Sequence, residues 1–280
     1  MEIQARAKIN WTLDVVGVRQ DGYHLLDTLM QPLALHDTLT FAPSEELSLR
    51  VAGAPSLSHG DDNLILKAAR ALQQISKTRS GAAITLKKRI PMGAGLGGGS
   101  ADCAAALKGL NAFWQLNLDF GCLCRLGEQL GADVPFCLHD APRRVQGIGE
   151  QLTPLAVGRT FPLVLLQPCA ALSTREVFTA FHQSALPSPD TARAAAALEK
   201  GDLDALAQAG GNVLESASIP LRPEIRQAKS SLARCGARYA CMTGSGSVVF
   251  GAFDDVLCAR EAWNTLKTQY DVCLLTETAL

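Results

Sequence analysis

The sequence contains no Cys-x-x-C pair, although nine of its 280 residues are cysteine. Cys122 and Cys124 lie close together, and the others are scattered singly. This pattern excludes a zinc knuckle and a dithiol redox centre, because both need cysteines at short, fixed spacings. An odd number of unpaired thiols suits a reducing compartment, so we expect a cytoplasmic protein.

The sequence also lacks an excess of charge and a long apolar run. Its 26 basic residues face 27 acidic ones, and a net charge of −1 gives no electrostatic reason to expect nucleic acid or a membrane surface as partner. The most apolar stretch, residues 161–172, contains Gln167 and two prolines and is too short to span a bilayer. We therefore expect a small-molecule substrate.

Apolar residues make up 48% of the chain, enough for one large core or two small ones. Alternating and helical spacings of these residues predict the elements. The first part reads as strands at 2–18, 23–37, 47–51 and 82–90 and helices at 64–76, 101–114 and 119–130. The second part reads as strands at 163–166, 239–242, 248–253 and 272–275 and helices at 174–181, 191–201, 223–234 and 255–268.

These elements predict an α+β protein of two domains. Proline, glycine and small residues cluster near 154–160, which places the domains at 1–157 and 158–280. With the alanine-rich helices after residue 174 set aside as an insertion, the second domain has the order β-α-β-β-α-β. That order is typical of the ferredoxin-like split βαβ fold.

Five glycines lie in the seven residues from Gly93 to Gly99, between a predicted strand and a predicted helix. Without Cβ atoms, such a backbone can approach a ligand closely. Ser100 stands where the N-cap of the helix is expected, and the free N–H groups and positive dipole end there attract phosphate. A flexible linker is the alternative, but linkers rarely join a strand to a well-capped helix. We predict a phosphate-binding loop.

The loop also matches the dinucleotide fingerprint, as Gly93-x-Gly95-x-x-Gly98 with Asp119 about twenty residues further on. The preceding Lys87, Lys88 and Arg89 oppose a nicotinamide-dependent oxidoreductase, because the strand before such a loop should be apolar. These basic residues instead indicate a site that neutralises the negative charge of a polyphosphate. A P-loop is excluded, because the sequence has no Gly-Lys dipeptide.

Two charged residues stand out elsewhere. Lys8 shares one face of the first strand with Arg6 and Asn10, although a lysine on a strand is more often simply solvated. Asp133 lies between Gly131-Ala132 and Val134-Pro135, where a turn or helix-cap aspartate is the ordinary interpretation. Each becomes significant only in combination with other motifs.

Two short segments leave alternatives open. Thr243, Gly244, Ser245 and Gly246 lie between two predicted strands, as either a hairpin turn or a second loop whose amides face a ligand. Tyr23-His24 follows the turn signal Asp21-Gly22, as either an aromatic anchor or a ligand-reading pair. The remaining histidines show no spacing typical of a metal site.

In this order, the motifs resemble those of the GHMP small-molecule kinases. The resemblance runs from about residue 3 to residue 253 and rests on Ala-Lys-Ile-Asn, Asp-Gly-Tyr-His, Pro-Met-Gly-Ala-Gly-Leu-Gly-Gly-Gly-Ser, Gly-Ala-Asp-Val-Pro and Gly-Ser-Gly. The second and fourth motifs narrow it to members that phosphorylate the 2-hydroxyl of a cytidine diphosphate sugar alcohol, on the non-mevalonate route to isopentenyl diphosphate. Another GHMP kinase, of homoserine or mevalonate type, remains the alternative, and an inactive nucleotide-binding regulator is less favoured.

The resemblance implies a fold and a set of ligands. The fold is a two-domain GHMP kinase, with an N-terminal ATP-binding domain like domain 2 of ribosomal protein S5 and a C-terminal ferredoxin-like domain. The ligands are ATP, Mg²⁺ and the cytidine diphosphate sugar alcohol, and no side chain stands out as a magnesium ligand. We expect a monomer or a weak homodimer.

The resemblance also assigns roles to residues. Asp133 matches the catalytic base of the family and Lys8 the lysine paired with it. Lys88 would approach the nucleotide, and the family often has a second serine where this chain has Ala101. The residues matching the ATP-binding set are Lys88, Pro91, Met92, Gly93, Ala94, Gly95, Leu96, Gly97, Gly98, Gly99, Ser100 and Ala101. Those matching the substrate-binding set are Tyr23 and Phe178 for the cytosine ring, His24 for its edge, and Asn10 and Thr174 for the diphosphate or erythritol part.

Overall fold

The computed structural model describes residues 1–54, 57–181 and 186–280 and divides into two compact units. The first unit comprises Met1–Ala7, Leu35–Ile90 and Gly97–Asp140, and the second comprises Lys8–Ala34, Pro91–Leu96 and Ala141–Leu280. This division differs from the expected boundary at residues 157 and 158. The reason is that β1 (Glu2–Val18) and β2 (His24–Ala42) each run through both units, so no single cut in the sequence separates them.

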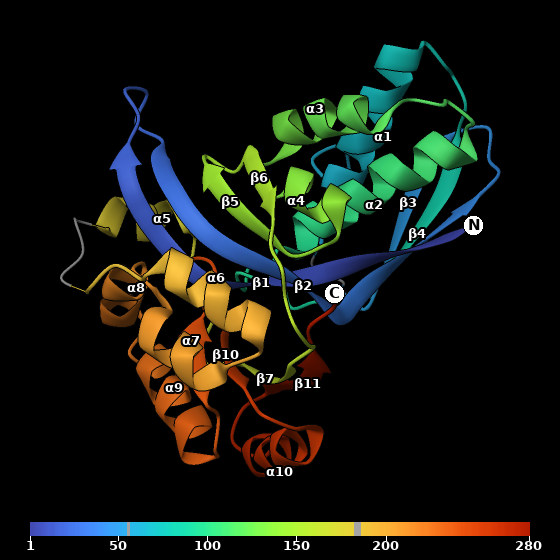
Figure 1. Cartoon of the computed structure of the whole chain (residues 1–280). Helices are drawn as coiled ribbons and strands as arrows, with labels where there is room; N and C mark the ends of the chain where they lie inside the picture. Colours follow the sequence, from blue (N-terminus) through green and yellow to red (C-terminus); the bar gives the residue numbers. More distant parts are fainter. Residues whose placement is uncertain (55–56, 182–185) are drawn as a thin grey trace. The chain divides into compact units, whose positions relative to one another are not determined.

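The first unit combines the end of β2 with β3 (Leu47–Ala52) and β4 (Ala82–Lys87). β4 pairs parallel with β3 and antiparallel with β2. A layer of four helices accompanies these strands in Figure 1: α1 (Leu64–Ser76), α2 (Gly98–Phe113), α3 (Phe120–Leu130) and α4 (Val134–His139). Alanine, cysteine and glycine dominate the buried face of α2, so its neighbours approach closely.

The second unit contains a four-stranded antiparallel sheet in the order β11-β7-β10-β9. Its strands are β7 (Pro162–Gln167), β9 (Tyr239–Met242), β10 (Val249–Ala252) and β11 (Val272–Glu277). The helices α9 (Glu224–Arg234) and α10 (Val256–Leu266) cover one face of this sheet (Figure 1). Chain order and sheet order together confirm the predicted ferredoxin-like β-α-β-β-α-β arrangement.

Side chains along the strands of this sheet point alternately to its two faces, so the core of the second unit lies on both faces. Val164 and Leu166 of β7 face the layer of α9 and α10, where Leu232 and Leu266 are also buried. Phe250 of β10 makes an edge-to-face contact with the ring of Trp11, with the centroids 5.4 Å apart. Burial on both faces explains why these strands are almost continuously apolar.

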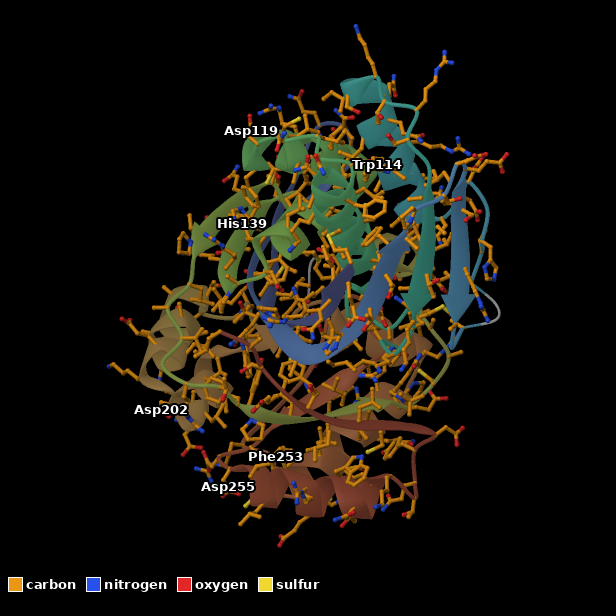
Figure 2. The ribbon with its side chains drawn as sticks, turned by 90° about the vertical axis from the view of Figure 1, so that its right-hand side faces the viewer. Trp114, Asp119, His139, Asp202, Phe253 and Asp255 are labelled. Carbon is orange, nitrogen blue, oxygen red and sulfur yellow. The ribbon has the colours of Figure 1, made fainter. Side chains whose placement is uncertain are left out.

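Three aspartates fix the beginnings of helices and are labelled in Figure 2. Asp119 accepts a hydrogen bond from Cys122 N at 2.7 Å, Asp202 from Ala205 N at 2.9 Å, and Asp255 from Leu257 N at 2.8 Å. Each satisfies an amide that the first helical turn leaves without a partner. Asp119 therefore caps α3 and follows no second strand, which removes the carboxylate that a dinucleotide site would need.

Most predicted elements are confirmed within a few residues, with two informative shifts. α2 begins at Gly98 and not at residue 101, and β4 ends at Lys87 and not at residue 90. The predicted helices at 174–181 and 191–201 are present as α5 (Thr174–Ala180) and α6 (Thr191–Lys200). The elements that were not predicted are α4, β5 (Arg143–Gly147), β6 (Gln151–Pro154), α7 (Leu203–Ala209), β8 (Gly211–Asn212) and α8 (Glu215–Leu221). Across the described ranges, no helix is both long and apolar enough to cross a membrane.

Candidate active site

The segment Pro91–Leu96 is held in the second unit by backbone contacts. Lys8 N donates to Leu96 O at 3.0 Å, and Val248 N donates to Ala94 O at 3.2 Å. Gly95 has φ +77°, and a Cβ atom there would lie 2.1 Å from Thr243 O. Only glycine fits both the left-handed backbone and this close approach. The glycine-rich stretch is thus a fixed loop and not a flexible linker.

The loop leads directly into the N-terminus of α2. Gly97 is the N-cap, with φ 68° and no side-chain capping hydrogen bond. The predicted N-cap, Ser100, instead lies in the first turn, because the left-handed residue starts the helix earlier. Ala101 N donates to Gly97 O at 2.9 Å, whereas the amides of residues 98–100 come before this first donor and have no acceptor within the helix. These amides at the positive end of the helix dipole can bind a phosphate group.

Lys88 is buried between two carboxylates of the first unit. Its Nζ donates to Asp37 Oδ2 at 2.5 Å and to Asp102 Oδ2 at 2.6 Å, and the side chain is only 5% exposed. The other oxygen of Asp37 accepts from Arg89 N at 2.5 Å and Ile90 N at 2.8 Å, which explains why β4 ends before these residues. The interpretation of Lys88 as a counter-charge for polyphosphate is therefore revised: its charge is compensated by protein carboxylates.

Two buried carboxylates around one ammonium group leave an uncompensated negative charge. Burial raises the pKa of Asp102 to about 7, although Lys88 opposes the shift. Burial lowers the pKa of Lys88, but Asp102 and Asp37 outweigh this effect and the pKa is raised overall. Asp102 Oδ1 has no hydrogen-bond partner among the described residues. The cluster joins residues immediately before the glycine-rich loop to the first turns of α2.

Lys8 and Asn10 meet on one face of β1, as predicted. Lys8 Nζ donates to Asn10 Oδ1 at 2.9 Å, and both side chains are buried. Asn10 Oδ1 also accepts from Gly244 N at 3.0 Å, and Asn10 N donates to Thr243 Oγ1 at 3.1 Å. The prediction that Asn10 touches the diphosphate or erythritol part is untested, but these contacts make it a connector between Lys8 and the loop after β9.

The loop Thr243–Gly246 turns its amides toward the protein. Thr243 N donates to Val248 O at 3.0 Å and Gly246 N to Thr243 O at 3.0 Å, while Gly244 N is bound to Asn10. These three amides therefore support the hairpin interpretation over a second phosphate loop. Ser245 Oγ lies 3.0 Å from Thr174 Oγ1, so the two hydroxyls form a pair beside the loop.

Side chains of α8 and β8 fix the loop from its other side. Glu215 accepts from Met242 N at 2.9 Å and from Lys229 Nζ at 2.5 Å. Asn212 Nδ2 donates to Met242 O and Gly244 O, both at 2.8 Å. The loop is consequently preorganised by buried polar contacts on either side of it.

The predicted cytosine-binding residues divide into a pair and a single ring. The His24 and Phe178 rings lie 4.9 Å apart between centroids, at an angle of 38°. Tyr23 is 60% exposed, and the Arg19 guanidinium lies 5.6 Å from its ring centroid. An exposed aromatic face such as that of Tyr23 can stack on a base, and a histidine can hydrogen-bond to the edge of one.

Asp133 is half-buried in the first unit, at the N-cap position of α4. Its side chain makes no capping hydrogen bond, while its carbonyl oxygen accepts from Cys137 N at 3.1 Å. The ordinary interpretation as a helix-cap aspartate is therefore not supported, because the carboxylate does not perform that task.

Sequence comparison identifies the family. The description "GHMP kinases N terminal domain" matches residues 63–141, and "GHMP kinases C terminal" matches residues 194–271. A 4-diphosphocytidyl-2-C-methyl-D-erythritol kinase of Pelotomaculum thermopropionicum is 43% identical over 98% of this chain and 96% of its own length. The chain belongs to the 4-diphosphocytidyl-2-C-methyl-D-erythritol kinase family. The relative of the same name from Symbiobacterium thermophilum is 41% identical, covering 95% of this chain and 94% of its own.

Solved structures agree with this GHMP kinase membership. A crystal structure titled 4-(cytidine 5'-diphospho)-2C-methyl-D-erythritol kinase matches with a TM-score of 0.87 and 34% identity, covering 100% of both chains. A homoserine kinase from Cytophaga hutchinsonii matches with a TM-score of 0.76 at 17% identity, over 100% of this chain and 95% of its own, which shows the shared fold alone. The two-domain GHMP kinase fold expected from the motifs is confirmed.

Several residues that shape this kinase site were not predicted. Asp37 and Asp102 are single carboxylates in otherwise apolar segments, and because buried charges are normally paired, each indicates a basic partner such as Lys88. Thr28 and Asn212 give no comparable signal, because their partners are backbone groups or a side-chain amide brought close only by folding. Glu215 is a further carboxylate with a basic partner, Lys229, 14 residues along the chain.

Proposed function

We propose that this chain phosphorylates the 2-hydroxyl of 4-diphosphocytidyl-2-C-methyl-D-erythritol, with ATP as donor and ADP and the 2-phosphate as products. The observation that carries the proposal is the near-full-length likeness to relatives of that name. The reaction would belong to the non-mevalonate route to isopentenyl diphosphate. The glycine-rich loop, the Lys8–Asn10 contact and the His24–Phe178 pair support the proposal with groups of suitable chemistry.

The proposed work of the loop is to hold the triphosphate. Phosphoryl transfer requires alignment of donor and acceptor and stabilisation of charge on the transferred group. The amides of residues 98–100 are fixed donors at a helix N-terminus, so they need no reorganisation as charge develops. Alignment can contribute about 7–11 kcal/mol to lowering such a barrier.

Asp133 is proposed as the base and Lys8 as its partner. The Asp133 carboxylate would take the proton of the acceptor hydroxyl, and a positioned base typically contributes about 10²–10⁴-fold. The Lys8 ammonium, fixed by Asn10, would stabilise the alkoxide that develops on the acceptor. The cluster of Asp37, Lys88 and Asp102 would keep the two ends of the phosphate-binding segment in place.

A magnesium ion accompanying ATP fits the donor set. No three acidic, histidine or cysteine side chains gather in a metal-sized group within the described part of the chain. Mg²⁺ needs only one or two protein oxygens, because substrate phosphates and water complete its shell. Ser100, in the first turn of α2, would supply a hydroxyl oxygen. When bound, Mg²⁺ neutralises phosphate charge.

An ADP-release assay with separate acceptors tests the function. We expect turnover with 4-diphosphocytidyl-2-C-methyl-D-erythritol and only background ADP release with homoserine, mevalonate or galactose. Asp133→Asn in the same assay measures the background. Turnover with homoserine or mevalonate and none with the cytidylyl compound would instead assign the chain to another GHMP kinase activity.

The surroundings in which this kinase would work are also proposed. All nine cysteines are thiols, which suits the cytoplasm. A monomer or a weak homodimer is proposed, and size-exclusion chromatography with light scattering across a hundredfold concentration range measures this directly. A tight higher oligomer would contradict it.

A further inference from the structure

The Asn10 amide has two chemically different ends, and the structure shows which end faces Lys8. Oδ1 can only accept hydrogen bonds, whereas Nδ2 can only donate them. Lys8 Nζ is a donor without acceptor capacity, and it lies 2.9 Å from Asn10 Oδ1. If the amide were turned over, two donors would face each other in a buried place. The orientation of this amide therefore decides whether Asn10 attracts or repels the Lys8 ammonium.

Gly244 N and Thr243 Oγ1 donate to Asn10 Oδ1 at 3.0 and 3.2 Å, and the other end of the amide is fixed by Thr28. Its hydroxyl donates to the backbone oxygen of Thr12 at 2.5 Å, which uses its one proton. Its oxygen can then only accept, and it accepts from Asn10 Nδ2 at 2.8 Å. This contact directs Nδ2 toward Thr28 and Oδ1 toward Lys8 and Gly244. Thr28 is 2% exposed, so water does not readily replace it.

We propose that Thr28 is a positioning residue for phosphoryl transfer, whose hydroxyl fixes the Asn10 amide and through it the Lys8 ammonium and the Thr243–Gly246 loop. The inference rests on the proposed role of Lys8. Without the hydroxyl, Asn10 Nδ2 loses the acceptor that Thr28 provides in a buried place, so the amide shifts from its present position. The direction that the amide gives to the Lys8 ammonium then changes, which lowers the rate of the chemical step more than it lowers affinity for ATP.

The test compares two buried threonines. Thr28→Val keeps the shape and removes the hydroxyl, and Thr28→Ser keeps the hydroxyl. Thr278→Val is the matched control, because Thr278 is 1% exposed and its Oγ1 accepts one backbone hydrogen bond, from Phe161 N at 2.9 Å. We expect Thr28→Val to lower kcat about tenfold or more with KM for ATP changed less than twofold. Thr28→Ser should restore kcat to within about threefold of the parent.

In the control variant, Thr278→Val, Tm should fall by a similar amount and kcat should stay unchanged. Equal kcat for Thr28→Val and Thr278→Val at matched Tm would overturn the inference, and so would a serine variant as slow as the valine variant. The parent protein and Lys8→Met, measured alongside, separate the two proposals: no turnover of the cytidylyl substrate by the parent counts against the proposed function itself, whereas normal turnover in Lys8→Met removes the lysine through which Thr28 would act. If Thr28→Val does not fold, alanine at both positions gives the same comparison.

Discussion

Two buried lysines show how residue chemistry separates a structural role from a proposed catalytic one. Lys88 lies between Asp37 and Asp102, so its ammonium neutralises protein charge. The Lys8 ammonium donates to the neutral side-chain carbonyl of Asn10, a contact that orients it. Removal of one partner from the buried charged group around Lys88 should therefore be costly to stability.

At this scale we predict that Lys8→Met and Asp133→Asn each lower turnover at least a hundredfold, while ATP still binds. The physical reason is the loss of charge stabilisation or of the base during proton removal, and a base contributes about 10²–10⁴-fold. Steady-state kinetics and a nucleotide titration measure the two quantities. Near-normal turnover in either purified variant would remove that residue from the proposed mechanism.

Tyr23→Ala should weaken binding of the cytidylyl substrate by about 1–3 kcal/mol, because a stacked aromatic ring contributes about that much per base. ATP affinity should stay unchanged. Phe120→Ala is the control, since Phe120 is also an exposed aromatic but packs against His139 and is not among the proposed cytosine-binding residues. Equal losses for both ligands in Tyr23→Ala would indicate that the ring is simply structural.

The pH dependence of stability should report the buried cluster around Lys88. The pKa of Asp102 is raised by burial to about 7 in the folded chain, against about 4 for an unfolded aspartate. The folded chain therefore binds more protons between pH 4 and 7, and the contribution of Asp102 to stability falls as pH rises through that range. Asp102→Asn should flatten the decline in Tm between about pH 4 and 7. Asp119→Asn, at a helix cap, is the control and should leave the dependence of Tm on pH unchanged. The same pH dependence in Asp102→Asn as in the parent would show that Asp102 is not its cause.

At the scale of elements, the glycine-rich loop depends on one close approach. Gly95 combines φ +77° with a Cβ position 2.1 Å from Thr243 O, whereas Gly236 has φ +91° and open space around it. Both alanine variants should lose about 1–3 kcal/mol from the left-handed backbone. Only Gly95→Ala should also displace the loop after β9 and lower MgATP affinity about tenfold or more. Equal nucleotide binding in both variants would show that the contact does not shape the loop.

For the whole molecule, ligand-induced stabilisation separates kinase from oxidoreductase. A ligand that binds only the native state increases the free energy of unfolding by mass action, and Tm rises with it. At a ligand concentration of a hundred times Kd, the gain in free energy is about 2.7 kcal/mol. MgATP should therefore raise Tm, and NADH at the same concentration should leave it unchanged. Differential scanning fluorimetry measures both. A response to NADH alone would reverse the assignment of the glycine-rich loop to a nucleoside triphosphate.

Local patterns in the sequence determined most of the elements, the ferredoxin-like order and the glycine-rich loop. Alternation, helical spacing and capping residues act over a few neighbours, so they can be interpreted without the fold. The family resemblance likewise rested on short motifs, and the comparisons confirm it.

Only the tertiary structure decided how distant polar groups are paired. The carboxylates Asp37 and Asp102 enclose Lys88 across 51 and 14 residues of sequence, and Thr28 orients Asn10 across 18. It also decided that β1 and β2 each serve two compact units, which no linear boundary could express. The physical reason is that burial forces each polar group to find a partner, and which partner is within reach is set by folding and not by sequence spacing.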